Sequence, residues 1–152
     1  MFTVTQNGKE LDKSKYKWDE ENKVFSTKEN NLVLDFSDYS EVTFKTGSSC
    51  TFNTGSYCTF NTGYSCTFKT GSYCTFNTGW NCTFNTGENC VIIRYDVKGV
   101  IEIPEKKTIK LNGYGISGYT EIKEEIKEEI KEVSCEGEVV EIEGKKYKLV
   151  SV

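Results

Sequence analysis

Six cysteines recur at intervals of eight residues, and cysteines at a fixed spacing could bind a metal ion, form disulfides or pack as small apolar side chains. They are Cys50, Cys58, Cys66, Cys74, Cys82 and Cys90, and a seventh, Cys135, stands apart. Zinc sites usually place two ligands about two to four residues apart, which this spacing does not, and the chain has no histidine to complete a ligand set. We therefore predict no metal and no cofactor, and we interpret the six cysteines as core residues.

The number of cysteines also bears on their redox state. The count of seven is odd, and no apolar segment of the kind found in export signals follows Met1. The sequence also has no apolar run long enough to span a bilayer. We expect a cytoplasmic protein without a membrane partner, whose thiols are reduced.

Catalysis needs groups that this sequence lacks. Without histidine the commonest general base is missing, and neither a Cys–His nor a Ser–His pair can form. The carboxylate pairs Glu124/Glu125 and Glu128/Glu129 lie in a lysine-rich segment and are typical of a solvated helix face. The sequence therefore predicts a protein that is not an enzyme.

The six regularly spaced cysteines belong to an eight-residue repeat, C-T-F-[NK]-T-G-x-x, which runs from Cys50 to Cys90 without insertion. Cys and Phe are two positions apart, so in a β-strand both side chains point to one face and the intervening Thr points to the other. The predicted core therefore adds the repeat phenylalanines to the cysteines: Phe44, Phe52, Phe60, Phe68, Phe76 and Phe84. The glycine in every unit predicts a corner with a positive φ angle.

Short repeats that each bury only half a core predict a stack of units. We expect a mainly β fold built around a parallel β-solenoid. Large aromatic residues recur sixteen positions apart, Tyr57 with Tyr73 and Tyr64 with Trp80, which indicates two octapeptides per coil.

The repeat register continues beyond the obvious units. Leu34 and Phe36 take the places of Cys and Phe at one end, and Cys90 and Ile92 take them at the other. The predicted solenoid therefore spans residues 34–97.

The flanking segments are predicted to close the two ends, because open ends would expose core and unpaired strand edges. Residues 1–33 are predicted to form a β-rich N-terminal cap, with turns at 6–9 and 20–23. Residues 98–152 are predicted to form a small β/α module with a helix at about 121–133, N-capped by Thr120, and a terminal hairpin at 139–152.

The expected helix has one narrow apolar stripe. The stripe consists of Ile122, Ile126, Ile130 and Val133. Such a stripe packs either on its own domain or on a second copy of the chain, so a homo-oligomer through these isoleucines stays open as an alternative.

Aromatic residues at the corners are the candidates for binding a partner. Tyr57 and Tyr73 should stack along one edge of the solenoid, Tyr64 and Trp80 along the other, and Tyr95 follows the last unit. Tyr and Trp are enriched among the residues that contribute most to protein interfaces. The alternative is that the stacked aromatics only rigidify the coils.

Charge favours a protein partner over nucleic acid. The repeat body carries few charged residues, and the sequence shows no basic patch near either end. We therefore expect no direct binding of nucleic acid.

Rows of threonine raise ice binding as a further alternative. Threonines at one repeat position should align on the two outer faces: Thr51, Thr67 and Thr83 on one, Thr59 and Thr75 on the other. The flat solenoids of insect antifreeze proteins place two threonines per coil on one face. Here the second outward position holds Asn53, Lys69 and Asn85. The lysine interrupts a flat array of hydroxyl groups.

The unit T-F-N-T-G-x-x-C, together with the segments Cys90–Val97 and Ile109–Tyr119, resembles a group of Cys-rich octapeptide-repeat β-solenoid proteins of bacteria and bacteriophages. The resemblance covers most of the chain, from about Phe2 to Tyr119. The Lys-, Glu- and Ile-rich composition, with a single proline, fits an AT-rich bacterial or phage genome.

This resemblance implies a biological context. Small non-enzymatic proteins of phages and mobile elements are often inhibitors of host defence, including anti-CRISPR proteins, and a rigid rod can block a nuclease by occupying its surface. We therefore expect a non-catalytic protein-binding protein in the cytoplasm of a bacterial host, acting as an inhibitor of a host defence nuclease. The alternatives are a structural or self-assembling phage component and an ice-binding solenoid.

Overall fold

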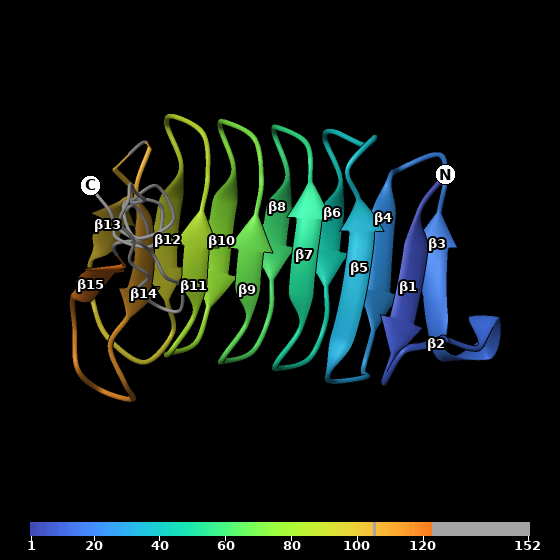
Figure 1. Cartoon of the computed structure of the whole chain (residues 1–152), viewed down its shortest axis with the longest axis horizontal. Helices are drawn as coiled ribbons and strands as arrows, with labels where there is room; N and C mark the ends of the chain where they lie inside the picture. The colour runs from blue at the N-terminus through green and yellow to red at the C-terminus, as the bar shows by residue number, and fades with distance from the viewer. Residues whose placement is uncertain (105, 123–152) are drawn as a thin grey trace, which may run out of the picture. The chain divides into compact units, whose positions relative to one another are not determined.

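The computed structural model describes residues 1–104 and 106–122, which form parallel coils stacked into a β-solenoid (Figure 1). The predicted fold class is confirmed, because the described residues are almost entirely strands and turns, with one 3-10 helix at Lys13–Lys15. All of them except Ile122 belong to one compact unit, Met1–Glu121. No helix in this part of the chain is long and apolar enough to cross a membrane. Cys135, most of the predicted helix and the predicted terminal hairpin lie outside the described residues.

Two sheets face each other, and each coil contributes a strand to both. Sheet A has the order β15-β14-β11-β9-β7-β5-β1-β2, and sheet B has the order β13-β12-β10-β8-β6-β4-β3. The strands are β1 Thr3–Gln6, β2 Lys9–Glu10, β3 Tyr16–Asp19, β4 Val24–Thr27, β5 Leu32–Phe36, β6 Thr43–Lys45, β7 Thr51–Thr54, β8 Thr59–Asn61, β9 Thr67–Lys69, β10 Thr75–Thr78, β11 Thr83–Asn85, β12 Val91–Arg94, β13 Val100–Glu102, β14 Thr108–Leu111 and β15 Tyr119–Ile122.

Each coil takes sixteen residues, as the two-octapeptide prediction requires. Phe44 pairs in register with Phe60, and Phe60 pairs with Phe76. Phe76 in turn pairs with Ile92 of β12. Paired residues of the repeat strands from β6 to β12 are therefore sixteen positions apart.

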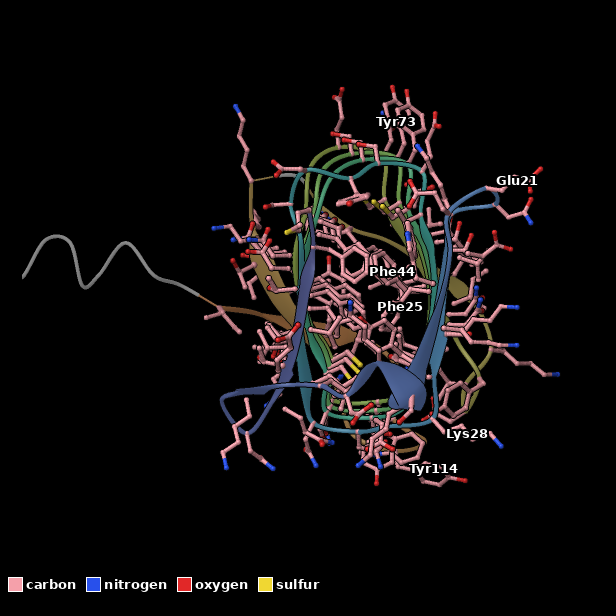
Figure 2. All side chains as sticks on the ribbon, turned by 90° about the vertical axis from the view of Figure 1, so that its right-hand side faces the viewer. Glu21, Phe25, Lys28, Phe44, Tyr73 and Tyr114 are labelled. Carbon is pink, nitrogen blue, oxygen red and sulfur yellow. The ribbon has the colours of Figure 1, made fainter. Side chains whose placement is uncertain are left out.

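Phenylalanine fills the space between the two sheets (Figure 2). The rings of Phe60 and Phe76 in sheet B stack with centroids 4.8 Å apart, and those of Phe68 and Phe84 in sheet A stack 4.9 Å apart. The two columns of rings meet edge to face, as between Phe60 and Phe68 at 5.0 Å. All six repeat phenylalanines and six repeat cysteines are at most 1 % exposed. Full burial of each ring stabilises the stack by roughly 2 to 3 kcal/mol.

The register of the first coil differs from the prediction. Leu34 pairs with Phe52 rather than with Cys50, and Phe36 pairs with Thr54. The chain between β5 and β6 is therefore two residues longer than between later strands. A shift of two residues keeps the same side chains pointing inward, so the alternation of the sequence could not detect it.

The predicted role of the repeat glycines is wrong. None of them has a positive φ; that conformation occurs one residue before each repeat cysteine, as at Tyr57 (62°) and Ser65 (58°). A Cβ atom on Gly63 would instead collide with the Ser48 hydroxyl of the preceding coil. The Gly63 N–H donates to the Gly47 carbonyl at 3.2 Å. Glycine is needed here because successive corners approach each other too closely for a side chain.

Antiparallel strands close the N-terminal end. β4 already pairs in parallel with β6, so parallel stacking begins at Val24, before residue 34. β3 then pairs antiparallel with β4, and β1 pairs antiparallel with β5. Phe2 stacks on Phe36 with ring centroids 4.3 Å apart, and Trp18 packs on the same ring at 5.7 Å. These rings cover the first coil.

Antiparallel strands also close the other end of the parallel stack. β13 pairs with β12, and β14 pairs with β11. β15 follows β14 at the edge of sheet A. Glu121 and Ile122 are strand residues of β15, so the predicted start of a helix at Glu121 with Thr120 as its N-cap is wrong. The pairing of β15 at the sheet edge prevails over the local helical spacing.

Candidate protein-binding surface

Aromatic residues line one corner of the solenoid. Tyr64 and Trp80 occupy the same corner position in successive coils, and their rings stack with centroids 4.9 Å apart and planes 8° from parallel. The corner geometry places them there, because each directly follows a repeat glycine whose N–H is hydrogen-bonded to the coil before it. This stacking agrees with the spacing of sixteen in the sequence.

Two further tyrosines extend this corner beyond the repeats. The Tyr114 ring meets Trp80 edge to face at 4.7 Å, and the Tyr95 ring approaches it at 6.1 Å. Tyr114 is 69 % exposed and Tyr95 is 61 % exposed. We call the four residues Tyr64, Trp80, Tyr95 and Tyr114 the tryptophan edge. Sequence reasoning missed Tyr114, because nothing in its glycine-rich surroundings shows that the chain folds back over Trp80.

A buried ion pair fixes the loop that carries Tyr114. Arg94 forms two hydrogen bonds with the Asp96 carboxylate, from Nε at 2.9 Å and from a terminal nitrogen at 2.6 Å. The same guanidinium donates to the carbonyls of Gly113 at 2.9 Å and Ile116 at 2.7 Å. Asp96 in turn accepts a hydrogen bond from the Gly115 N–H at 2.8 Å. These contacts fix the backbone on both sides of Tyr114.

The electrostatics of this pair follow from its surroundings. Burial alone would raise the pKa of the Asp96 carboxyl, but the hydrogen bonds from Arg94 and from the Gly115 N–H outweigh it, so the pKa lies below its ordinary value. Asp96 is therefore a carboxylate at neutral pH. It serves to position the loop.

The opposite corner carries a second, smaller stack. The rings of Tyr57 and Tyr73 have centroids 5.1 Å apart and planes 5° from parallel. Their exposed fractions are 57 % and 48 %. Tyr73 and Tyr114 point away from opposite corners in Figure 2. We call Tyr57 and Tyr73 the tyrosine edge.

The repeat cysteines form two internal rows rather than a reactive site. One row contains Cys50, Cys66 and Cys82, and the other contains Cys58, Cys74 and Cys90. Within the rows, a backbone N–H donates to the sulfur of the next coil, as from Cys66 to Cys82 at 3.4 Å. All six are free thiols sealed from solvent.

Hydrogen bonds between neighbouring thiols set their acidity. Hydrogen bonding with Cys66 and burial both raise the pKa of Cys50. The bond with Cys50 lowers the pKa of Cys66, but the bond with Cys82 and burial outweigh it and bring that pKa to about 11. In the other row, hydrogen bonding raises the pKa of Cys74 and lowers that of Cys90. Because all six side chains are at most 1 % exposed, external groups cannot reach them in the folded protein.

Threonine takes part in the core as well as in the outer rows. The threonines before several glycines point inward, and their hydroxyls donate to the carbonyl of the following glycine, as from Thr78 to Gly79 at 3.2 Å. The outward rows align as predicted, with Thr51 over Thr67 and Thr67 over Thr83. Asn53, Lys69 and Asn85 pair in the second outward row of sheet A.

Metal-ligating groups are not clustered in the part of the chain that the structure describes. No three His, Cys, Asp or Glu side chains among residues 1–104 and 106–122 are placed to hold one ion. Comparison of the chain with protein-family models, curated proteins and solved structures found no match.

Proposed function

We propose that this protein is a non-catalytic protein-binding protein that docks on its partner through the tryptophan edge. The observation that carries the proposal is the contact of Trp80 with rings from two directions, Tyr64 at 4.9 Å and Tyr114 at 4.7 Å. Tyr and Trp bury much area at a low cost in side-chain entropy, and they dominate binding energies when they lie in the centre of an interface.

The apolar surface continues beyond the aromatic rings. Ile116 lies in the same loop as Tyr114 and is 60 % exposed. Its carbonyl accepts from Arg94, which fixes the backbone at this point. A pre-organised surface loses little conformational freedom on binding, so more of its contact energy appears as affinity.

The finer proposal is that the partner is a host defence nuclease and that the protein inhibits it. Support comes from the resemblance to octapeptide-repeat proteins of bacteria and phages, and from the lack of histidine in the chain. A stack of hydrogen-bonded coils has the rigidity that an inhibitor needs if it acts by occupying a surface.

The two corners of the solenoid provide a matched experiment. We would compare affinity capture from a bacterial lysate by the wild type, by Tyr64→Ala/Trp80→Ala and by Tyr57→Ala/Tyr73→Ala, and then assay the nuclease activity of the retained protein. We expect the tryptophan-edge variant alone to lose capture while its melting stays cooperative. Equal capture by all three proteins would refute this docking surface.

The same experiment separates the alternatives. Recovery of the protein's own chain alone would favour a structural or self-assembling component, including association through Ile122, Ile126 and Ile130, of which the last two lie outside the described residues. Ice binding predicts thermal hysteresis that is lost when Thr67 and Thr83 are replaced. We expect no hysteresis, because Lys69 interrupts the second outward row.

A further inference from the structure

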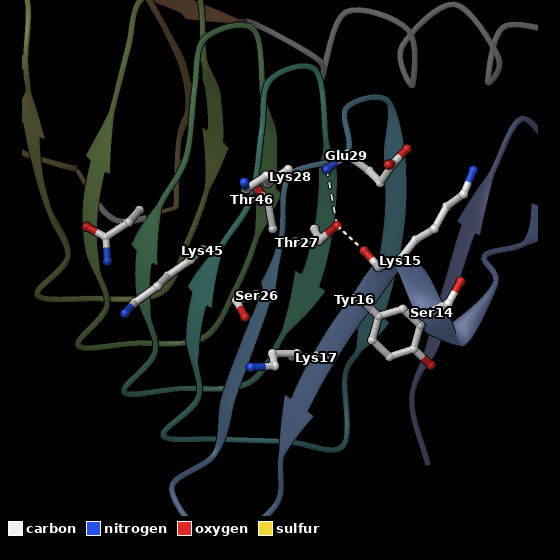
Figure 3. Close-up of a pocket in the computed structure, with 11 residues that line it drawn as sticks. Ser14, Lys15, Tyr16, Lys17, Ser26, Thr27, Lys28, Glu29, Lys45 and Thr46 are labelled. Atoms are coloured by element: carbon white, nitrogen blue, oxygen red, sulfur yellow. Dashed lines mark hydrogen bonds between the residues drawn. The ribbon is translucent and has the colours of Figure 1, made fainter.

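Lysines from several parts of the chain border one groove on the outer face of sheet B (Figure 3). Lys17 lies on β3 and Lys45 lies on β6, whereas Lys15 precedes β3 and Lys28 follows β4. The groove has a volume of 620 Å³. That size falls within the range of about 300 to 1,000 Å³ typical of small-ligand sites, and the groove is open to solvent along its length and not an enclosed cavity. The fold therefore gathers lysines that the sequence places in separate segments.

Strand pairing fixes the position of the two central lysines. Lys17 pairs with Ser26, and Ser26 pairs with Lys45, so the three form one outward row across β3, β4 and β6. Adjacent strands are about 4.8 Å apart, which places the Cα atoms of Lys17 and Lys45 about 10 Å apart. Both side chains extend in the same direction, whereas Lys15 extends away from them (Figure 3).

None of these four lysines forms an ion pair with a carboxylate within the described residues, although the Asp12 carboxylate lies near enough to Lys15 to interact with it electrostatically. The ion pairs found there join Arg94 to Asp96 and Lys107 to Glu121. The groove lining includes the acidic residue Glu29, whose carboxylate accepts from Gln6 Nε2 at 3.2 Å. The ammonium groups of Lys17 and Lys45 are therefore available to pair with a bound anion.

Neutral hydrogen-bond donors lie among the charges. Ser26 stands between Lys17 and Lys45, and Asn61 follows on β8. No hydrogen bond within the described part of the chain engages either side chain. By contrast, the Thr27 hydroxyl donates to the Lys15 carbonyl at 2.7 Å and accepts from the Glu29 N–H at 3.1 Å, which fixes the rim (Figure 3).

We propose that this groove binds a small ligand with two or more adjacent phosphate groups, as in inorganic polyphosphates and nucleoside triphosphates. Two cations about 10 Å apart, with the Ser26 hydroxyl between them and the Asn61 amide beyond Lys45, suit a short chain of phosphates better than a single phosphate. The site lies on the face of sheet B, whereas the tryptophan edge lies at a corner, so this proposal does not depend on the proposed protein partner.

The test is calorimetric titration of the full chain with inorganic tripolyphosphate and, separately, with ATP, at low ionic strength. Lys17→Gln/Lys45→Gln removes the two central charges. Lys69→Gln/Lys110→Gln is the matched control, because it removes two exposed charges from sheet A, and Lys69 has the same place in its repeat as Lys45. We expect the first variant to bind tripolyphosphate at least about tenfold more weakly and the control to bind like the wild type.

A second measurement locates the ligand. In NMR titrations with tripolyphosphate, the amides of Lys17, Ser26 and Lys45 should shift, while that of Lys69 should not. Tighter binding of ATP than of tripolyphosphate would identify a nucleotide as the source of the phosphates, and equal binding would identify the phosphate chain itself.

Three outcomes would overturn the proposal. The first is no binding of either probe by the wild type, and the second is an equal loss of affinity in both variants, which would indicate only non-specific charge. The third is tighter binding of single-stranded DNA or of a polyglutamate peptide than of tripolyphosphate, which would assign the groove to a macromolecule.

Discussion

Arg94 pairs with Thr78 of the preceding coil, and both side chains are buried. The inward row that contains Thr78 in sheet B therefore ends at the guanidinium group of Arg94. The side chain of Arg94 is 1 % exposed and that of its partner Asp96 is 2 % exposed. A charge buried to this degree must be paired, and here the carboxylate and two loop carbonyls accept its hydrogen bonds. The end of the solenoid and the position of Tyr114 therefore depend on the same contact.

Replacing Arg94 by Met should destabilise the protein strongly. The Asp96 carboxylate would remain buried without its partner, which typically costs about 3 to 5 kcal/mol. Urea unfolding followed by circular dichroism would measure the loss. Lys98→Met, at an exposed lysine nearby, is the control and should change stability little. Adding Asp96→Asn to Arg94→Met should restore part of the lost stability; an unchanged urea midpoint in the single variant would contradict the role of the pair.

Asp96 should also make the free energy of unfolding depend on pH. Its pKa is lowered in the folded state, so the carboxylate contributes stability that is complete above the unfolded-state pKa of about 3.9 and is lost as the pH falls through the lower folded-state value. Urea midpoints measured from pH 7 down to strongly acidic buffers should fall more steeply for the wild type than for Asp96→Asn. Parallel curves for the two proteins would show that other carboxylates account for the acid sensitivity.

Substitution of Gly63 should destabilise the protein, whereas substitution of Ser65 should change its stability little. A Cβ at Gly63 would displace the Ser48 hydroxyl, which accepts a hydrogen bond from the Tyr64 N–H at 3.2 Å, so Gly63→Ala should cost about 1 to 3 kcal/mol. Ser65 has a φ of 58°, a conformation that glycine adopts without strain. Ser65→Gly should therefore change stability by less than about 1 kcal/mol. The melting temperatures of the two variants test this prediction. A lower melting temperature for Ser65→Gly than for Gly63→Ala would instead support the prediction that the repeat glycine adopts the positive φ angle.

The sequence predicts well what repeats and poorly what occurs once. Phe60 and Phe76 could be placed in one column because burial at a fixed period leaves few ways to stack the units. The insertion of two residues after Leu34 was invisible because it preserves alternation. The sequence predicts the positive φ angle at the wrong residue because glycine can serve either a left-handed turn or a close approach, and only the distance between coils distinguishes these roles.

In the candidate sites too, contacts between repeated positions can be predicted from the sequence, whereas contacts with segments that occur once cannot. The stacking of Tyr64 on Trp80 follows from their spacing, whereas the contact of Tyr114 with Trp80 depends on a loop that Arg94 holds from nineteen or more residues away. The groove beside Lys17 and Lys45 likewise depends on a hairpin that joins the stack, and the sequence separation of the two lysines gives no sign of it. Contacts between residues so far apart in the sequence can be placed only when the path of the chain between them is known.

The six repeat cysteines should be inert in the folded protein and fully reactive after unfolding. Each is at most 1 % exposed, so lack of access prevents alkylation in the folded protein even at Cys90, whose pKa lies below its ordinary value. Iodoacetamide applied at neutral pH, followed by mass spectrometry of peptides, should leave Cys50 to Cys90 unmodified in the native protein and label all of them in denaturant. Rapid native labelling of Cys66 would show that the coils open locally, and absence of labelling in denaturant would show that the cysteines are oxidised rather than packed as free thiols.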